Sequence, residues 1–150
     1  MKRYCIIGYP IGHSRSPKIH NAEFRKFGMA ARYEAISVRP EDLAKFMKSY
    51  RENFCGGNVT IPHKEKIIKF LDKVNPEASA IGAVNTIVNR NGKLIGYNTD
   101  ALGALAALRT KIKSLRGKHA VVIGAGGAAR AIVYGLKKAG AKVTIINRTL

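Results

Sequence analysis

The chain has 150 residues, of which 46% are apolar, and it carries a formal net charge of +18 at pH 7. This length and composition are sufficient for a buried core, so we expect a globular protein. The longest nearly apolar stretch, residues 120–129, contains three glycines and is far shorter than the ~20 residues of a membrane-spanning helix. Gly8 and Pro10 interrupt the apolar N-terminal segment before a signal peptide could form, so we expect a cytoplasmic protein with no membrane partner.

The excess of positive charge, 27 Lys and Arg against 9 Asp and Glu, predicts that the protein attracts anions. Nucleic acid, phosphorylated cofactors and carboxylate substrates are all anions that such a protein could bind. The cations are spread along the whole chain and have no interleaved aromatic stripe, which favours an ordinary solvated basic surface over a specific nucleic-acid groove. A third explanation is that the chain is incomplete and that its missing part is more acidic.

The first third of the chain alternates between strand and helix patterns. Residues 2–8 have the composition of a buried strand, and a turn rich in Gly, Pro and Ser follows them. A helix is predicted at about 17–27 with Ser16 as its N-cap. Residues 31–38 alternate as a strand, and Pro40 then opens a second helix. The apolar stripe of that helix consists of Leu43, Phe46, Met47 and Tyr50.

The middle of the chain continues this alternation and adds a hairpin. A short strand is predicted at 54–60 and a helix at 64–74. The buried face of that helix is expected to consist of Ile67, Ile68 and Leu71. Two strands follow, joined through the Asn91-Gly92 turn, whose residues tolerate the left-handed conformation that tight hairpins require. No internal repeat is present, so repeat architectures are not expected.

A shift in composition at Thr99 marks a predicted domain boundary. An Ala- and Leu-rich helix begins there and leads to the strand at 118–124, which is apolar from Ala120 onward. We predict an α/β fold in which residues 1–100 form a substrate-binding and catalytic domain with a mostly parallel sheet. Residues 101–150 are predicted to contain a linker helix and the first β-α-β unit of a Rossmann dinucleotide-binding domain.

A glycine turn is the basis of that second prediction. Residues 121–149 follow the order strand, turn, helix and strand, with Gly124, Gly126 and Ala129 in the pattern G-x-G-x-x-A. Gly124 permits the tight turn, Gly126 lets the backbone approach a pyrophosphate, and the helix N-terminus receives the phosphate charge. The alternative is a tight turn that binds nothing.

The residues after the second strand of this unit predict which dinucleotide binds. A ribose 2′-hydroxyl normally meets Asp or Glu about 20 residues after the glycines. This chain has Asn147, Arg148 and Thr149 there. A guanidinium offers a planar fork to a phosphate and no carboxylate is present to repel it, so NADP is favoured over NAD. Alternatively, Arg148 is an ordinary exposed cation.

The segment NVTIPHK, residues 58–64, brings Thr60 and Lys64 to a junction between a predicted strand and a helix. The first turn of a helix favours acidic side chains, so a lysine there indicates a chemical role. An ammonium held near a reacting oxygen by a carboxylate can donate or accept a proton. Asp100 is the candidate partner, because it follows Thr99, a good N-cap, and the next helix favours its ionised form.

Ser14 and Ser16 are a further candidate site in the loop after the first strand. Most serines before helices are turn or cap residues, but two hydroxyls beside a helix N-terminus also suit a carboxylate. His13, His20 and His63 show no metal-ligand spacing, and we predict no metal site. The two cysteines, Cys5 and Cys55, also lack such spacing and are expected to be reduced thiols in preference to a disulfide.

Together these segments resemble the shikimate dehydrogenases. The resemblance covers nearly all of the chain and rests on YPIGHSRSPKIHN, GGNVTIPHKE, IGAVNTIV, GYNTDALG and GAGGAARA followed by NRT. It implies the reversible, NADPH-dependent reduction of 3-dehydroshikimate to shikimate in aromatic amino-acid biosynthesis. A quinate/shikimate dehydrogenase of broader specificity, an inactive fragment and a basic anion- or nucleic-acid-binding module are the alternatives.

The resemblance also implies roles for individual residues. Ser14 and Ser16 would hold the substrate carboxylate. The ring hydroxyls would meet Thr60, Lys64, Asn85 and Asp100, with Lys64 and Asp100 as the catalytic pair, although which of the two moves the proton stays open. The cofactor would be held by Gly124, Gly126, Gly127, Ala128 and Arg130, and its 2′-phosphate by Asn147, Arg148 and Thr149.

Two features depart from the family pattern. Arg15 stands where the family more often has an apolar residue, so it either adds an attraction for carboxylate or faces solvent. The chain ends at Leu150, after one β-α-β unit, whereas family members continue through the rest of the cofactor domain. We therefore expect a fragment that is inactive by itself, and the oligomeric state is left open.

Overall fold

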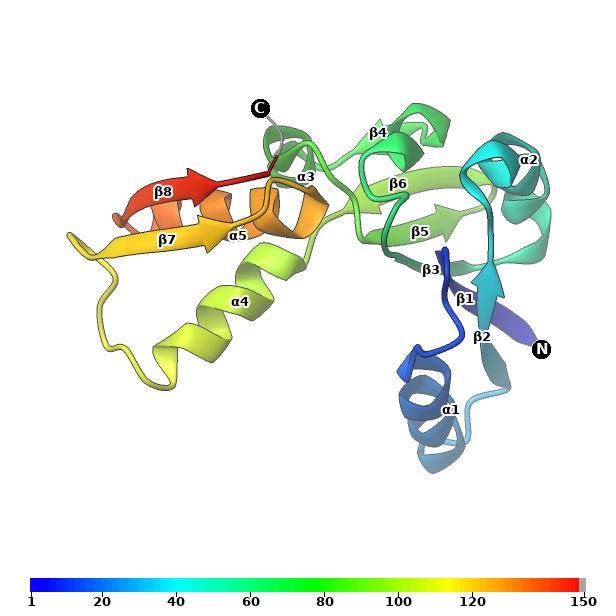
Figure 1. Cartoon of the computed structure of the whole chain (residues 1–150). Helices are drawn as coiled ribbons and strands as arrows, with labels where there is room; N and C mark the ends of the chain where they lie inside the picture. The colour runs from blue at the N-terminus through cyan, green and yellow to red at the C-terminus, as the bar shows by residue number, and fades with distance from the viewer. Residues whose placement is uncertain (149–150) are drawn as a thin grey trace.

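A computed structural model describes residues 1–148 (Figure 1). In chain order the elements are β1 (Lys2–Gly8), α1 (Ser16–Lys26), β2 (Ala31–Ser37), η1 (Pro40–Asp42), α2 (Leu43–Asn53), β3 (Gly56–Val59), η2 (Lys66–Phe70), β4 (Lys73–Val74), α3 (Pro76–Ile81), β5 (Thr86–Arg90), β6 (Lys93–Tyr97), α4 (Asp100–Arg109), β7 (His119–Ile123), α5 (Gly127–Lys138) and β8 (Lys142–Ile146), where η marks a 3-10 helix. The mixed α/β class and the mostly parallel sheet predicted from the sequence are confirmed.

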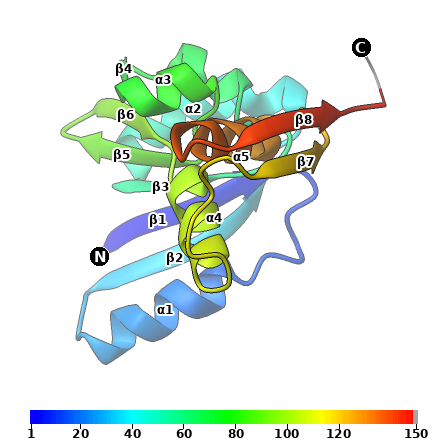
Figure 2. The same cartoon turned by 90° about the vertical axis from the view of Figure 1, so that its left-hand side faces the viewer.

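Two separate sheets organise these elements. The larger has the strand order β2-β1-β3-β5-β6-β4, and the smaller pairs β7 with β8. β1 runs parallel to β2 and β3, whereas β5 runs antiparallel to β3 and to its hairpin partner β6. Figure 1 shows the smaller sheet with α4 and α5 on one side of the molecule and the larger sheet on the other, and Figure 2 views the molecule from the side of the smaller sheet. The division into residues 1–100 and 101–150 as domains stays a prediction.

Each sheet packs on its own apolar cluster. The larger cluster joins β1, β3, β5 and β6 to the α2 stripe predicted from helical spacing, with Leu43, Met47 and Tyr50 buried. The smaller cluster lies between α4, α5 and the two strands of the second sheet, and it includes Leu105, Val122 and Leu136. Parallel β-α-β connections of this kind place the carboxyl ends of the strands, and the loops that leave them, at one edge of each sheet.

The predicted helix at 64–74 is wrong in type and length. Only residues 66–70 are helical, as the 3-10 helix η2, because Leu71 is already extended (φ −99°, ψ 146°). Lys73 and Val74 then pair with β6 as the short strand β4. The end of the segment therefore forms hydrogen bonds with the edge of the sheet and does not continue the helix. Of the three predicted buried residues, Ile67 is fully buried and Ile68 and Leu71 are partly buried.

Two further features of the helices differ from the expectation: the N-cap of α1 and the presence of α3. Arg15, and not Ser16, is the N-cap of α1; Ser16 is its first residue, and its backbone N–H bonds to the Ser14 hydroxyl. Helix α3 was not predicted. Its start is marked by Asn75, whose side chain accepts a hydrogen bond from the Glu77 N–H, and its end by Gly82 in the left-handed region.

Candidate active site

The turn between β3 and η2 is fastened to its surroundings at several points. The backbone N–H of Thr60 donates to the Ile7 carbonyl in β1, and the N–H of Val84 donates to the Lys64 carbonyl. His63 is fully buried, and its Nε2 lies 2.7 Å from the Val38 carbonyl. Because the turn is held from three directions, the backbone that carries the Lys64 side chain is fixed in position. Lys64 precedes η2 and does not lie in a first helical turn. The prediction that placed this lysine in the first turn of a helix is therefore wrong.

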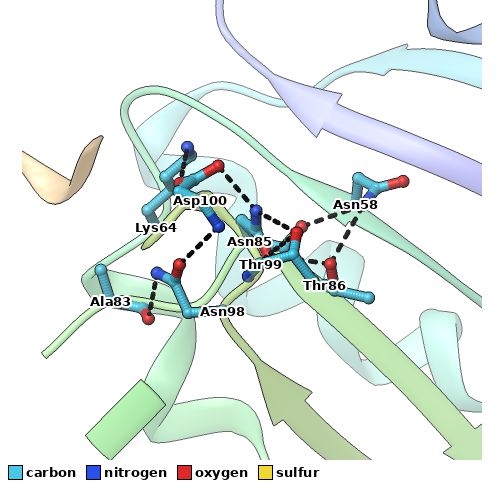
Figure 3. Close-up of polar contacts among 8 residues, drawn as sticks. All are labelled: Asn58, Lys64, Ala83, Asn85, Thr86, Asn98, Thr99 and Asp100. Atoms are coloured by element: carbon cyan, nitrogen blue, oxygen red, sulfur yellow. Dashed lines mark hydrogen bonds and ion pairs between the residues drawn. The ribbon is translucent and has the colours of Figure 1, made fainter. Parts of the chain in front are cut away.

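Lys64 and Asp100 meet, as predicted. Lys64 Nζ donates to Asp100 Oδ2 over 2.6 Å, and both side chains are mostly buried. Asp100 is the first residue of α4, where the unpaired N–H groups of the helix favour a carboxylate. Its own N–H donates to Asn98 Oδ1, while Asn98 Nδ2 donates to the Ala83 carbonyl, so Asn98 fixes the start of the helix (Figure 3).

Asn98 belongs to this polar group but is not among the residues predicted from the sequence. Thr99 was expected to cap α4, but its side chain makes no capping hydrogen bond, and the Asn98 side chain bonds to the Asp100 N–H in its place. The signal was present in the sequence, because an Asn two residues before a helix start commonly makes this local bond. Asn98 is buried with both ends of its amide partnered.

Asn85 completes the polar group around Asp100. Its Nδ2 donates to Asp100 Oδ1 over 2.8 Å and to Thr99 Oγ1 over 2.9 Å. Its Oδ1 accepts hydrogen bonds from the Thr99 N–H and from the Thr86 hydroxyl. The Asp100 carboxylate therefore has a different donor on each oxygen, Asn85 on one and Lys64 on the other (Figure 3). Charge-assisted hydrogen bonds of this kind fix the orientation of a carboxylate.

A cleft of about 600 Å³ opens beside this group. Thr60 and Lys64 line one wall, and the glycine turn with Gly124, Gly126 and Gly127 lines the other. The two walls approach each other closely, since a Cβ at Gly127 would lie 3.0 Å from Lys64 Cβ. The chain folds so that Thr60 and Lys64 and the predicted phosphate turn face one space.

The glycine turn has the geometry that the sequence pattern predicts. Gly124 has φ +104°, a conformation that side chains other than glycine rarely adopt, and Gly126 is the N-cap of α5. A Cβ at Gly124 or Gly126 would have no heavy atom within 4 Å, so the backbone at both positions borders open space. Ala128 and Arg130 lie in the first turn of α5, and Arg130 pairs with Glu65 across 3.3 Å.

The residues expected at the cofactor 2′-phosphate follow β8. Asn147 and Arg148 are both exposed. Thr149 lies outside the described residues. No acidic residue occurs between β8 and Leu150. The residue types after β8 therefore suit the 2′-phosphate of NADP better than the free 2′-hydroxyl of NAD.

Ser14 and Ser16 stand apart from the Lys64 group. They belong to the loop between β1 and α1, and in residues 1–148 no hydrogen bond joins either of them to Lys64, Asn85 or Asp100. The loop nevertheless begins beside the cleft, because the Tyr9 N–H donates to the Ile61 carbonyl. Gly8 makes this approach possible, since a Cβ there would lie 2.6 Å from Thr60 Cγ2.

Within the described part of the chain, no group of three or more His, Cys, Asp or Glu side chains is arranged to hold a metal ion. Over the same residues, no helix has both the length and the apolar character needed to cross a membrane. Cys5 and Cys55 are both free thiols, the first buried and the second exposed.

Comparison with known proteins adds the family. Residues 6–87 match the family model of the shikimate dehydrogenase substrate binding domain. This chain belongs to the shikimate dehydrogenase family. A curated relative, shikimate dehydrogenase (NADP(+)) of Symbiobacterium thermophilum, is 52% identical over 146 residues, which is 96% of this chain and 50% of that protein. The chain thus spans about half the length of the curated relatives it matches.

Solved structures of the same family superpose closely on the chain. The crystal structure of shikimate dehydrogenase from Aquifex aeolicus matches with a TM-score of 0.95 and 46% identity, covering 99% of this chain and 56% of that one. A shikimate 5-dehydrogenase from Thermus thermophilus, in complex with NADP(H) and shikimate, matches with a TM-score of 0.90 and 43% identity, covering 99% of this chain and 57% of that one.

Proposed function

We propose that this chain provides the substrate-binding and catalytic half of an NADP-dependent shikimate dehydrogenase, which interconverts shikimate and 3-dehydroshikimate. The observation that carries the proposal is the 2.6 Å Lys64–Asp100 contact at the wall of a cleft whose opposite wall is the glycine turn. A lysine that is held by a carboxylate and shares a cavity with a dinucleotide turn suits oxidation of an alcohol by a nicotinamide cofactor. The names and bound ligands of the relatives support the same reaction.

The residues of the second wall fit a dinucleotide. The open space at Gly124 and Gly126 leaves room for a pyrophosphate against the backbone, and the N-terminus of the twelve-residue helix α5 offers unpaired N–H groups. Ala128 and Arg130 in the first turn would complete this cradle, and Arg148 with Asn147 would meet the 2′-phosphate. When bound, NADPH supplies the hydride that reduces the carbonyl carbon of the substrate.

Lys64 would lie beside the substrate oxygen that changes between hydroxyl and carbonyl. Its ammonium can give a proton to that oxygen, or orient a water that does so, while Asp100 holds the ammonium in place. The amide of Asn85, held by Asp100 and Thr99, and the hydroxyl of Thr60 would position the neighbouring ring hydroxyls. Ser14 and Ser16, at the start of α1, would bind the carboxylate of the substrate. Positioning of this kind is worth several powers of ten in rate.

The test is shikimate-dependent reduction of NADP, followed spectrophotometrically with the complete gene product, with quinate and NAD as alternative substrates. We expect turnover with shikimate, and a lower KM for NADP than for NAD. Turnover with quinate equal to that with shikimate would replace the proposal by the broader quinate/shikimate activity. No turnover with either acid would contradict it.

A further inference from the structure

Tyr33 in β2 is a buried tyrosine that the proposed function does not use. It is 4% exposed and is held on three sides. Asn21 of α1 makes two hydrogen bonds of 2.8 Å to its main chain, one in each direction. The His20 ring stacks on the Tyr33 ring with centroids 4.3 Å apart, and the Tyr33 hydroxyl donates to Asn58 Oδ1 over 2.5 Å.

The contacts on the α1 side matter because this helix has little other support. None of its residues is buried, and Figure 1 shows it at the edge of the molecule beside β2. Its anchors are the Asn21 and His20 contacts to Tyr33, together with the Phe24 contact to Tyr4. Ser14 and Ser16 stand at the start of the same helix, so the place of the candidate carboxylate site depends on how α1 is held.

The contacts on the other side lead to the Lys64 group. Asn58 Nδ2 donates to the Thr86 hydroxyl and to the Asn85 carbonyl, each over 3.2 Å. Register places Asn58 opposite Thr86 in neighbouring strands, which is why the side chains meet. The Thr86 hydroxyl donates to Asn85 Oδ1, and Asn85 Nδ2 donates to Asp100 Oδ1 (Figure 3). Asp100 then accepts from Lys64.

The direction of every bond in this series is fixed by chemistry. The carbonyl oxygen of Asn58 can only accept, so the Tyr33 hydroxyl must donate, and burial raises the pKa of Tyr33, which keeps its proton in place. An amide NH₂ can only donate, so the Thr86 oxygen accepts from Asn58 and its hydrogen is directed to Asn85. Removing the first donor leaves the Asn58 oxygen without its hydrogen bond and loosens the links that follow.

We propose that the Tyr33 hydroxyl is a positioning group that joins the two halves of the substrate site, the Ser14/Ser16 end on α1 and the Lys64–Asp100 end. The proposal rests on the proposed function, since it assigns both ends to one substrate. Tyr33 touches neither substrate nor cofactor and acts only through Asn58, Thr86 and Asn85. Its effect should therefore be that of one well-placed hydrogen bond.

The chain offers a closely matched control. Tyr4 lies opposite Tyr33 in register on the adjacent strand and packs on Phe24 of α1. Among residues 1–148 its hydroxyl makes no hydrogen bond to another group. Tyr33→Phe and Tyr4→Phe each remove one oxygen and keep the ring, so a general effect on packing should appear in both variants.

The kinetic test compares these variants in the complete gene product. We expect Tyr33→Phe to lower kcat/KM for shikimate about 3–10-fold, the size of one hydrogen bond, with the KM for NADP within about twofold of wild type. Tyr4→Phe should leave both unchanged. In a Thr86→Val background, Tyr33→Phe should lower kcat/KM by less than about twofold. The reason is that Thr86→Val already removes the hydrogen bonds that link Asn58 to Asn85. Equal effects of the two Tyr→Phe changes, or losses that multiply in the double variant, would overturn the proposal.

A second measurement does not depend on turnover. The side-chain NH₂ signals of Asn58 and Asn85 can be followed by NMR without any ligand. Tyr33→Phe should shift both and Tyr4→Phe neither; a shift confined to Asn58 would overturn the proposal, because the effect would not reach the Asp100 group. If both signals shift but the wild type neither oxidises nor binds shikimate, the proposed function fails and the connection to Asp100 stands.

Discussion

The two sides of the candidate site differ in how much of their hydrogen bonding is already satisfied. On the Lys64 side, both oxygens of Asp100 and both ends of the Asn85 amide have partners within the chain. On the glycine side, a Cβ at Gly126 would meet no heavy atom within 4 Å, and the first N–H groups of α5 have no hydrogen-bond partner within the helix. Groups that perform proton chemistry must be held before the substrate arrives, whereas groups that bind a phosphate must keep donors free for it. The difference predicts that substitutions on the first side change kcat and those on the second change cofactor affinity.

The largest effect is expected for Lys64→Ala. Loss of a positioned acid or base lowers a rate on the order of 10²–10⁴-fold, so kcat of the complete gene product should fall by that amount while substrate affinity changes less. Lys66→Ala is the control, because Lys66 is an exposed lysine at the start of η2. If kcat of Lys64→Ala stays within twofold of wild type, Lys64 has no role in proton transfer and is an ordinary surface cation.

Arg148→Ala should have the next largest effect, and it should act on affinity alone. Removing one charged hydrogen-bonding group costs about 1.5–3 kcal/mol, which should raise the KM for NADP roughly tenfold or more and leave that for NAD nearly unchanged. Lys142→Ala, at the opposite end of β8, is a matched change in charge. Equal losses with NADP and NAD would remove the 2′-phosphate role.

Gly127→Ala tests the place where the two sides touch. The added methyl would lie 3.0 Å from Lys64 Cβ and 3.3 Å from Ala83 Cβ, so the α5 N-terminus and the Lys64 turn must separate slightly. Because small misplacements are costly in rate, we expect kcat/KM to fall about 3–10-fold. Gly103→Ala in α4, where a methyl meets nothing, should leave kcat/KM unchanged and stabilise the fold by about 0.5–1 kcal/mol. The same kinetics for both variants would contradict the close contact.

Asp72→Asn should have the smallest effect on activity and should change stability alone. The Arg51 side chain and then the Leu94 N–H hold the pKa of Asp72 below its ordinary value. A lowered folded-state pKa contributes stability above the unfolded pKa of about 3.9 and loses it as the pH falls below that value. Thermal unfolding should therefore separate wild type from Asp72→Asn at pH 7 and bring them together in acid, with kcat unchanged. A gap that widens in acid would mean that the sign is wrong.

Much of the arrangement of the candidate site could be predicted because its residues carry local signals. Asp100 and the glycines stand at positions where helix polarity or backbone conformation favours their types. The helix rule that favours Lys64 does not apply to the turn before η2, yet the structure brings Lys64 to Asp100. Asn58 and Tyr33 carry no local signal. Their contacts come from strand register, which places them on the two neighbours of β1 and sets Asn58 opposite Thr86.

The fold was predicted least well where the sheet competes with local preference. The segment 64–74 has apolar spacing suited to a helix, yet β6 offers an unpaired edge that captures Lys73 and Val74. That competition depends on a strand about twenty residues further along the chain, so periodicity alone cannot decide it. By contrast, the Asn91-Gly92 hairpin was predictable because both residues adopt positive φ within the turn itself.

A double-mutant cycle between Lys64→Ala and Asp100→Asn, measured as kcat for shikimate oxidation, tests whether the two residues form one chemical unit. Residues that act as one unit are not additive: once one is lost, losing the other costs little more. We expect kcat of the double variant to lie within about threefold of that of Lys64→Ala alone. If the two losses multiply, Lys64 and Asp100 act independently, and the pair is not the chemical centre of this protein.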